Sequence, residues 1–86
     1  LTTMATMYIV KEEIIIDNTF NEGIIIKTTN KERAIKKAEK VFQDMLKHPN
    51  LIGCTQRKTE NKYEAFNTIS NDSYIVEIEE YSSDIE

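Results

Sequence analysis

The segment NKERAIKKAEKVFQDMLKH, residues 30–48, decides the fold because its apolar residues recur with the period of one helix face. They follow an i, i+3, i+4, i+7 spacing, which predicts one buried stripe on an α-helix. The stripe consists of Ala34, Ile35, Ala38, Val41, Phe42, Met45 and Leu46. Asn30 is a suitable N-cap, because its side-chain oxygen can accept from free N–H groups of the first turn. Pro49 disfavours helical backbone at the preceding residue, so we expect the helix to end at His48.

Strand patterns lie on both sides of this helix. The segments rich in β-branched and alternating apolar residues are 7–16, 23–29, 51–58, 62–70 and 73–81. Three charged residues at 11–13 indicate an edge, a bulge or a bend in the first strand. Residues 17–22, DNTFNE, are expected to form a longish hairpin loop. The predicted order is β-β-α-β-β-β, an α+β fold with one helix packed on a mostly antiparallel sheet.

The register of the last three strands is predicted from two turn signals, Glu60-Asn61 and Asn71-Asp72. Two-residue turns at both places would set Ala65 opposite Ile78. One face would then carry the apolar residues, which are Ile52, Cys54, Ala65, Ile69, Tyr74, Val76 and Ile78. The other face would carry Gly53, Thr55, Arg57, Glu64, Phe66, Thr68, Ile75, Glu77, Glu79 and Tyr81. On that face we expect Arg57, Glu64 and Glu79 to form a charge ladder.

Length and composition predict one small soluble domain. The chain has 86 residues, of which 40% are hydrophobic and 30% charged. We expect a flexible leader at 1–6, the domain at 7–81 and an acidic tail at 82–86. No apolar run approaches the roughly 18 residues of a membrane span, so no membrane association is expected. A single cysteine is consistent with a cytoplasmic protein. The Ile-, Lys- and Asn-rich composition suggests an AT-rich coding sequence and an origin in a phage or mobile element.

Enzyme chemistry has little support in the sequence. The chain contains one histidine, His48, and one cysteine, Cys54, and has no glycine-rich phosphate loop. Cys54 alternates onto the predicted core face, where a buried thiol is unreactive. No metal-binding or nucleophile motif occurs. We therefore expect no catalytic residues, no metal and no cofactor.

A basic cluster on the helix is one candidate binding site. Arg33, Lys36, Lys37 and Lys40 lie on one side and could contact phosphates. A net charge of −4 and the absence of interleaved aromatic residues weigh against this reading. A nucleic-acid-binding accessory protein is therefore the alternative hypothesis.

The main hypothesis uses the sheet face that the helix leaves uncovered. Apolar groups among carboxylates suit a protein partner. The candidate protein-binding residues are Phe66, Glu77, Glu79 and Tyr81, with Phe20 in the hairpin loop as a possible anchor. This predicts a non-catalytic module that inhibits or regulates a host system. An exposed sheet face and edge also allow a homodimer.

Overall fold

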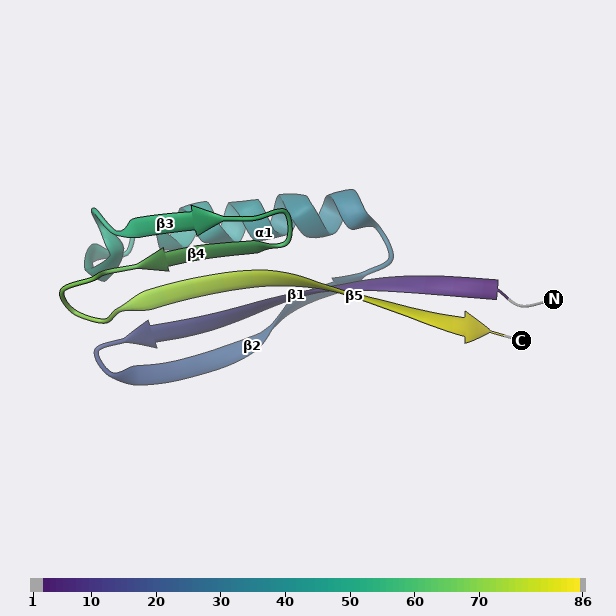
Figure 1. The fold of residues 1–86 in the computed structure, drawn as a ribbon, viewed down its shortest axis with the longest axis horizontal. Coiled ribbons are helices and arrows are strands. Elements are labelled where there is room, and N and C mark those ends of the chain that lie inside the picture. Colours follow the sequence, from purple (N-terminus) through teal and green to yellow (C-terminus); the bar gives the residue numbers. More distant parts are fainter. Residues whose placement is uncertain (1–2, 86) are drawn as a thin grey trace.

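The computed structural model describes residues 3–85 and confirms the α+β fold. One helix packs against one side of a five-stranded antiparallel sheet with strand order β2-β1-β5-β4-β3 (Figure 1). The elements are β1 (Thr3–Ile16), β2 (Thr19–Thr28), α1 (Lys31–Met45), the 3-10 helix η1 (Pro49–Leu51), β3 (Thr55–Lys58), β4 (Lys62–Phe66) and β5 (Ser73–Ile85). Within residues 3–85 no helix is long and apolar enough to cross a membrane.

The helix forms as its sequence predicts. Asn30 is the N-cap, and its Oδ1 accepts from the Arg33 backbone N–H at 3.1 Å. Ala34, Ala38 and Phe42 are buried. The two alanines allow close approach to the sheet, and the Phe42 ring stacks on Tyr74 with the ring centroids 6.3 Å apart. The core is therefore the interface between one stripe of α1 and one face of the sheet.

The helix ends earlier than expected. Its last residue is Met45, and His48 caps the following 3-10 helix by accepting from the Asn50 backbone N–H through Nδ1 at 3.1 Å. Pro49 opens that short helix. Proline is well suited to a first helical position, because its missing N–H needs no partner there.

The first hairpin differs from the prediction of a long loop at 17–22. Its turn consists of Asp17 and Asn18, with φ of 51° and 62°. Positive φ at both central residues is the property of a type I′ turn, whose twist matches that of the flanking strands. Phe20 consequently lies in β2, opposite Ile15. The irregularity expected at residues 11–13 is present as a register shift between Val10 and Lys11.

The register between β4 and β5 also corrects the prediction. Ala65 lies opposite Tyr74 rather than Ile78. The cause is a loop longer than two residues after Phe66, closed by a hydrogen bond from the Asn67 N–H to the Asp72 carbonyl at 2.8 Å. The predicted and observed registers differ by four residues, an even number, so each side chain keeps its predicted face.

Two isoleucines assigned to the core are instead exposed. Ile52 and Ile69 retain 70% and 94% of their accessible surface. Residues 51–54 and 67–72 belong to connections rather than strands, so alternation does not apply to them. Cys54 is half-buried and packs against the core.

Strands β1 and β5, which are neighbours in the interior of the sheet, extend past both expected domain boundaries. Residues 3–6 of the expected leader belong to β1 and pair with residues 82–85 of β5, part of the expected tail. Residues 1, 2 and 86 lie outside the described part of the chain. The paired start of β1 and end of β5 project beyond the helix (Figure 1). Both strands continue because each satisfies the backbone hydrogen bonds of the other.

Candidate functional site

The candidate site is the side of the sheet opposite α1, which we call the open face. No other segment of residues 3–85 covers it. Direct partners in an antiparallel pair share a face, so the register assigns its side chains in rows across the strands. The open face comprises Thr55, Arg57, Lys62, Glu64, Phe66, Ser73, Ile75, Glu77, Glu79, Tyr81, Met7, Ile9, Lys11, Glu13, Ile15, Phe20, Glu22, Ile24 and Lys27.

The first row, at the end of the sheet with the β1–β2 turn, is apolar. Phe66 lies opposite Ser73, Ser73 opposite Ile15, and Ile15 opposite Phe20. Phe20 is 54% exposed, whereas Phe66 is half-buried beneath the Arg57 guanidinium, which lies 5.5 Å from its ring centroid. Two aromatic residues that are distant in the sequence thus lie in one transverse row.

The second row is acidic. Glu64 lies opposite Ile75, Ile75 opposite Glu13, and Glu13 opposite Glu22. Glu13 and Glu22 are both exposed. They form a like-charge pair, an arrangement that destabilises a sheet relative to neutral pairs.

The third row contains two lysines, each held by a carboxylate. Lys11 Nζ lies 2.8 Å from Glu79 Oε1, and Lys62 Nζ lies 3.2 Å from Glu64 Oε1. The hydrogen bond from Lys11 lowers the pKa of Glu79 and raises the pKa of Lys11. The Tyr81 hydroxyl also donates to Glu79, which raises the pKa of Tyr81. Of the expected ladder, Arg57 does lie opposite Glu64, but the prediction is wrong for Glu79, because Ile75 lies opposite Glu64 and Glu79 pairs with Lys11.

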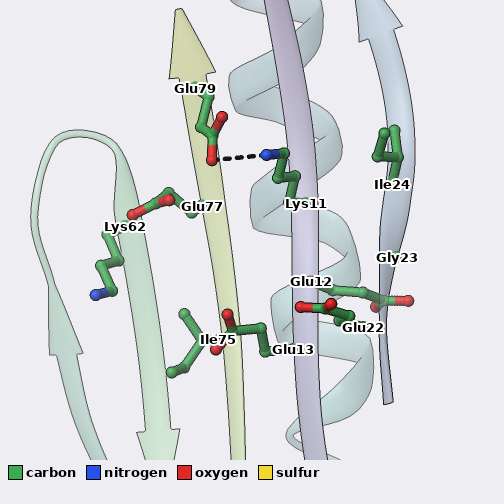
Figure 2. A pocket seen from close by; sticks show the side chains of 10 residues that line it. All are labelled: Lys11, Glu12, Glu13, Glu22, Gly23, Ile24, Lys62, Ile75, Glu77 and Glu79. Atoms are coloured by element: carbon green, nitrogen blue, oxygen red, sulfur yellow. Dashed lines mark hydrogen bonds and ion pairs between the residues drawn. The ribbon is translucent and has the colours of Figure 1, made fainter.

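A shallow groove of about 600 Å³ runs along the second and third rows across β2, β1, β5 and β4. Figure 2 shows its side chains, with Lys11 directed toward Glu79 and α1 behind the sheet. The lining residues are Lys11, Glu12, Glu13, Glu22, Gly23, Ile24, Lys62, Ile75, Glu77 and Glu79. Carboxylates outnumber lysines five to two in this lining, so the groove is acidic with apolar side chains at Ile24 and Ile75.

The structure brings together only some of the predicted protein-binding residues. Phe20 and Phe66 share the first row, and Glu77 and Glu79 lie farther along β5. Tyr81 is eight residues from the first row, which at a rise of about 3.3 Å per residue is roughly 26 Å. The groove residues Glu13, Glu22 and Ile24 were missed by the sequence reasoning. A turn placed at Asp17-Asn18 would have revealed Glu13 opposite Glu22 by counting.

The basic cluster lies on the other side of the molecule. Arg33, Lys36 and Lys40 are exposed, and Lys37 is half-buried. Residues 31–47 carry six Lys or Arg and three Asp or Glu, whereas the rest of the chain carries five and twelve. Positive and negative charge are thus segregated between the helix and the sheet.

The chain offers few groups for catalysis or metal binding. His48 Nδ1 accepts a backbone hydrogen bond, and Cys54 packs at the core margin. Within residues 3–85 no group of three or more His, Cys, Asp or Glu side chains is placed to hold a metal ion. On the open face, apolar groups lie beside carboxylates.

Comparison with known proteins gives no family assignment. No family model matches the chain, no curated protein matches it, and no solved structure matches it. The function is therefore inferred from the chemistry of the molecule's own surfaces.

Proposed function

We propose that this protein is a non-catalytic module that binds another protein through its open face. It acts by occupying its partner's surface, as an inhibitor or regulator of a host system would. On the basis of the composition, the proposal includes an origin in a phage or mobile element and action in the cytoplasm. The observation that carries it is the first row, where Phe66, Ile15 and Phe20 remain on a face that no described segment covers.

The physical reason is the unused apolar surface. Burying apolar surface contributes about 25 cal/mol per Å², and aromatic residues are enriched in protein interfaces. Phe20 is more than half exposed although it lies in a well-formed strand. A partner that covers the first row would remove this surface from water. The neighbouring carboxylates and ion pairs would form the polar rim of such an interface.

The test is capture of partners from a nuclease-treated lysate of the source organism by the immobilised protein. The Phe20→Ser/Phe66→Ser variant is expected to lose a protein band that the unmodified chain retains. Arg33→Glu/Lys36→Glu/Lys40→Glu is the matched control, because it alters exposed residues on the opposite side. Circular dichroism and thermal melting establish that both variants fold. A band that survives the phenylalanine substitutions but disappears with the helix substitutions would contradict the proposal.

The separation of positive charge on α1 from negative charge on the sheet supports an alternative function, which is nucleic-acid binding through α1. Phosphate contacts by Arg33, Lys36 and Lys40 would make the affinity fall steeply with salt. A labelled duplex titrated at 50 and 200 mM salt checks this, with the same triple variant as the probe. Strong binding that the variant abolishes would favour this alternative. Weak binding that the variant leaves unchanged would eliminate it.

A further inference from the structure

The acidic row places two residues of like charge in directly opposite positions. Glu13 and Glu22 lie directly opposite each other, where Cβ atoms are about 4.5–5.5 Å apart. Neither forms an ion pair with a Lys or Arg in residues 3–85. A sheet selected for stability alone would place an opposite charge or a neutral residue at one of these positions.

The nearest cations are already engaged. Lys11 is held by Glu79, and Lys62 is held by Glu64. These pairs keep the lysine heads away from Glu13 and Glu22, so the groove presents unneutralised carboxylates to solvent. Glu13 and Glu22 are thus available to a cation supplied by a binding partner.

The groove is wide enough for a helix, and its rows have a similar spacing. From β2 to β4 it crosses three inter-strand spacings, about 14 Å, and an α-helix with side chains is about 10–12 Å across. Successive rows on one sheet face are about 6.8 Å apart, close to the roughly 6 Å between residues i and i+4 of a helix. Apolar residues Ile15, Ile75 and Ile24 alternate with the carboxylates over three rows.

A second copy of this chain does not match the groove. Two open faces packed together would oppose carboxylates to carboxylates. The outer surface of α1 is cationic but lacks apolar groups, since its exposed residues are all polar or charged: Lys31, Glu32, Arg33, Lys36, Glu39, Lys40, Gln43 and Asp44. It would leave the isoleucines and phenylalanines of the open face uncovered.

We propose that the open face binds a basic amphipathic helix of a partner protein, which lies in the groove with Lys or Arg side chains between Glu13 and Glu22. The apolar stripe of that helix covers Ile15, Ile75 and Ile24 and extends toward the phenylalanine row. This inference rests on the proposed function and names the chemistry of its partner. A protein whose basic helix serves another function, such as contact with nucleic acid, would be blocked by such occupancy.

The test uses a synthetic 18-residue amphipathic peptide of leucine and lysine, titrated into the full chain and followed by amide chemical shifts. A leucine–glutamate peptide of the same pattern and a serine–lysine peptide of the same charge are the controls. The leucine–lysine peptide is expected to bind and to shift the amides of Glu13, Glu22 and Ile75. Both control peptides are expected to bind at least tenfold more weakly.

Two matched variants separate local recognition from net charge. Glu13→Gln/Glu22→Gln is expected to weaken peptide binding about fivefold to tenfold. Glu32→Gln/Glu39→Gln removes the same charge from exposed positions on α1 and is expected to change affinity less than about twofold. Equal losses in the two variants, or equal binding of the serine–lysine peptide, would overturn the inference.

Thermal stability supplies an independent readout. Glu22→Gln removes the like-charge pair and is expected to raise Tm by about 1–4 °C while it weakens peptide binding. A lowered Tm would show that Glu22 serves the fold and would contradict the inference. If the leucine–lysine peptide fails to bind while Phe20→Ser/Phe66→Ser still abolishes lysate capture, the helix assignment is wrong and the proposed function stands. If the peptide fails to bind and the phenylalanine substitutions leave lysate capture unchanged, the proposed function is wrong as well.

Discussion

The hydroxyl of Tyr74 donates a hydrogen bond to the Glu12 carboxylate, with Oη and Oε1 separated by 2.6 Å. Tyr74 is 1% exposed and its ring stacks on Phe42 in the core. The bond gives the buried hydroxyl a partner and explains why a charged residue is compatible with the helix-facing side of β1. A buried tyrosine usually requires such a partner.

Removal of this hydroxyl should destabilise the protein. Tyr74→Phe leaves the half-buried Glu12 carboxylate without its donor, and the expected loss is about 1–2 kcal/mol in the free energy of unfolding. Tyr63→Phe is the matched control, because Tyr63 also packs on Phe42 but has no carboxylate partner in the described structure. Its expected change is within about 0.5 kcal/mol. Urea denaturation of the two variants checks the difference, and equal losses would contradict it.

The hydrogen bond between Tyr74 and Glu12 also leads us to expect a loss of stability in alkali. Burial, followed by the hydrogen bond and charge of Glu12, raises the pKa of Tyr74, and burial raises that of Tyr63. A tyrosine with a raised pKa in the folded state stabilises the fold fully below its unfolded pKa of about 10 and loses this contribution as pH rises further. Unfolding measured from pH 8 to 11.5 should therefore show a decline above pH 10 that is shallower in Tyr74→Phe. A decline of equal slope would exclude Tyr74 as its source.

Asp72 links three connecting segments of the chain. Its hydrogen bonds lead us to expect that the protein loses stability in acid. Its carboxylate accepts from Ser70 Oγ at 2.8 Å, from the Asp17 N–H at 3.0 Å and from Asn50 Nδ2 at 3.1 Å. These bonds, that of Ser70 first, lower its pKa. A depressed carboxyl pKa gives stability that is present above the ordinary value near 4 and is lost as pH falls through the folded value.

The variant Asp72→Asn tests this role. It replaces an acceptor oxygen by a donor amide, so we expect a clear drop in Tm at pH 7 and a flatter dependence of Tm on pH between 5 and 2. Asp44→Asn is the control, because Asp44 is exposed and makes only a loose 3.8 Å contact with Lys47. An Asp72→Asn profile parallel to that of the unmodified chain would contradict the assignment.

The β1–β2 turn depends on residues that tolerate positive φ. Asn18 has φ of 62°, so Asn18→Ala should cost about 1 kcal/mol through steric crowding of its Cβ. Asn18→Gly should equal or exceed the unmodified stability, because glycine adopts this conformation freely. Chemical denaturation of both variants measures the difference. If alanine and glycine behave alike, the turn does not have this geometry in solution.

The corrected core also makes a prediction. Ile52→Ser and Ile69→Ser should each change stability by less than about 0.5 kcal/mol, because both side chains are largely exposed. Phe42→Ala should cost about 3–5 kcal/mol, because Phe42 is fully buried between the helix and the sheet. Thermal melting distinguishes the two classes. A large loss of stability in Ile69→Ser would show that Ile69 is buried, as the predicted two-residue turn at Asn71-Asp72 requires.

Local sequence signals determined the helix and the strand faces. The apolar stripe through Ala34, Ala38 and Phe42 and the cap at Asn30 are properties of one short segment, and the structure confirms them. The inward placement of Tyr74, Val76 and Ile78 follows from period-two alternation, which survives any register shift by an even number of residues. The α+β class required nothing beyond these signals.

Tertiary structure decided the strand pairing and therefore the candidate site. Strand β1 pairs with both β2 and β5, and only this joint register places Phe20 and Phe66 in one row and Glu13 opposite Glu22. The connection after Phe66 is closed by a hydrogen bond between Asn67 and Asp72, and both residues also bond to Asn50, which lies in η1. Alternation specifies which face a residue occupies, but it does not specify its neighbour on that face. That neighbour depends on loop closure and long-range hydrogen bonds, which exist only after the sheet has formed.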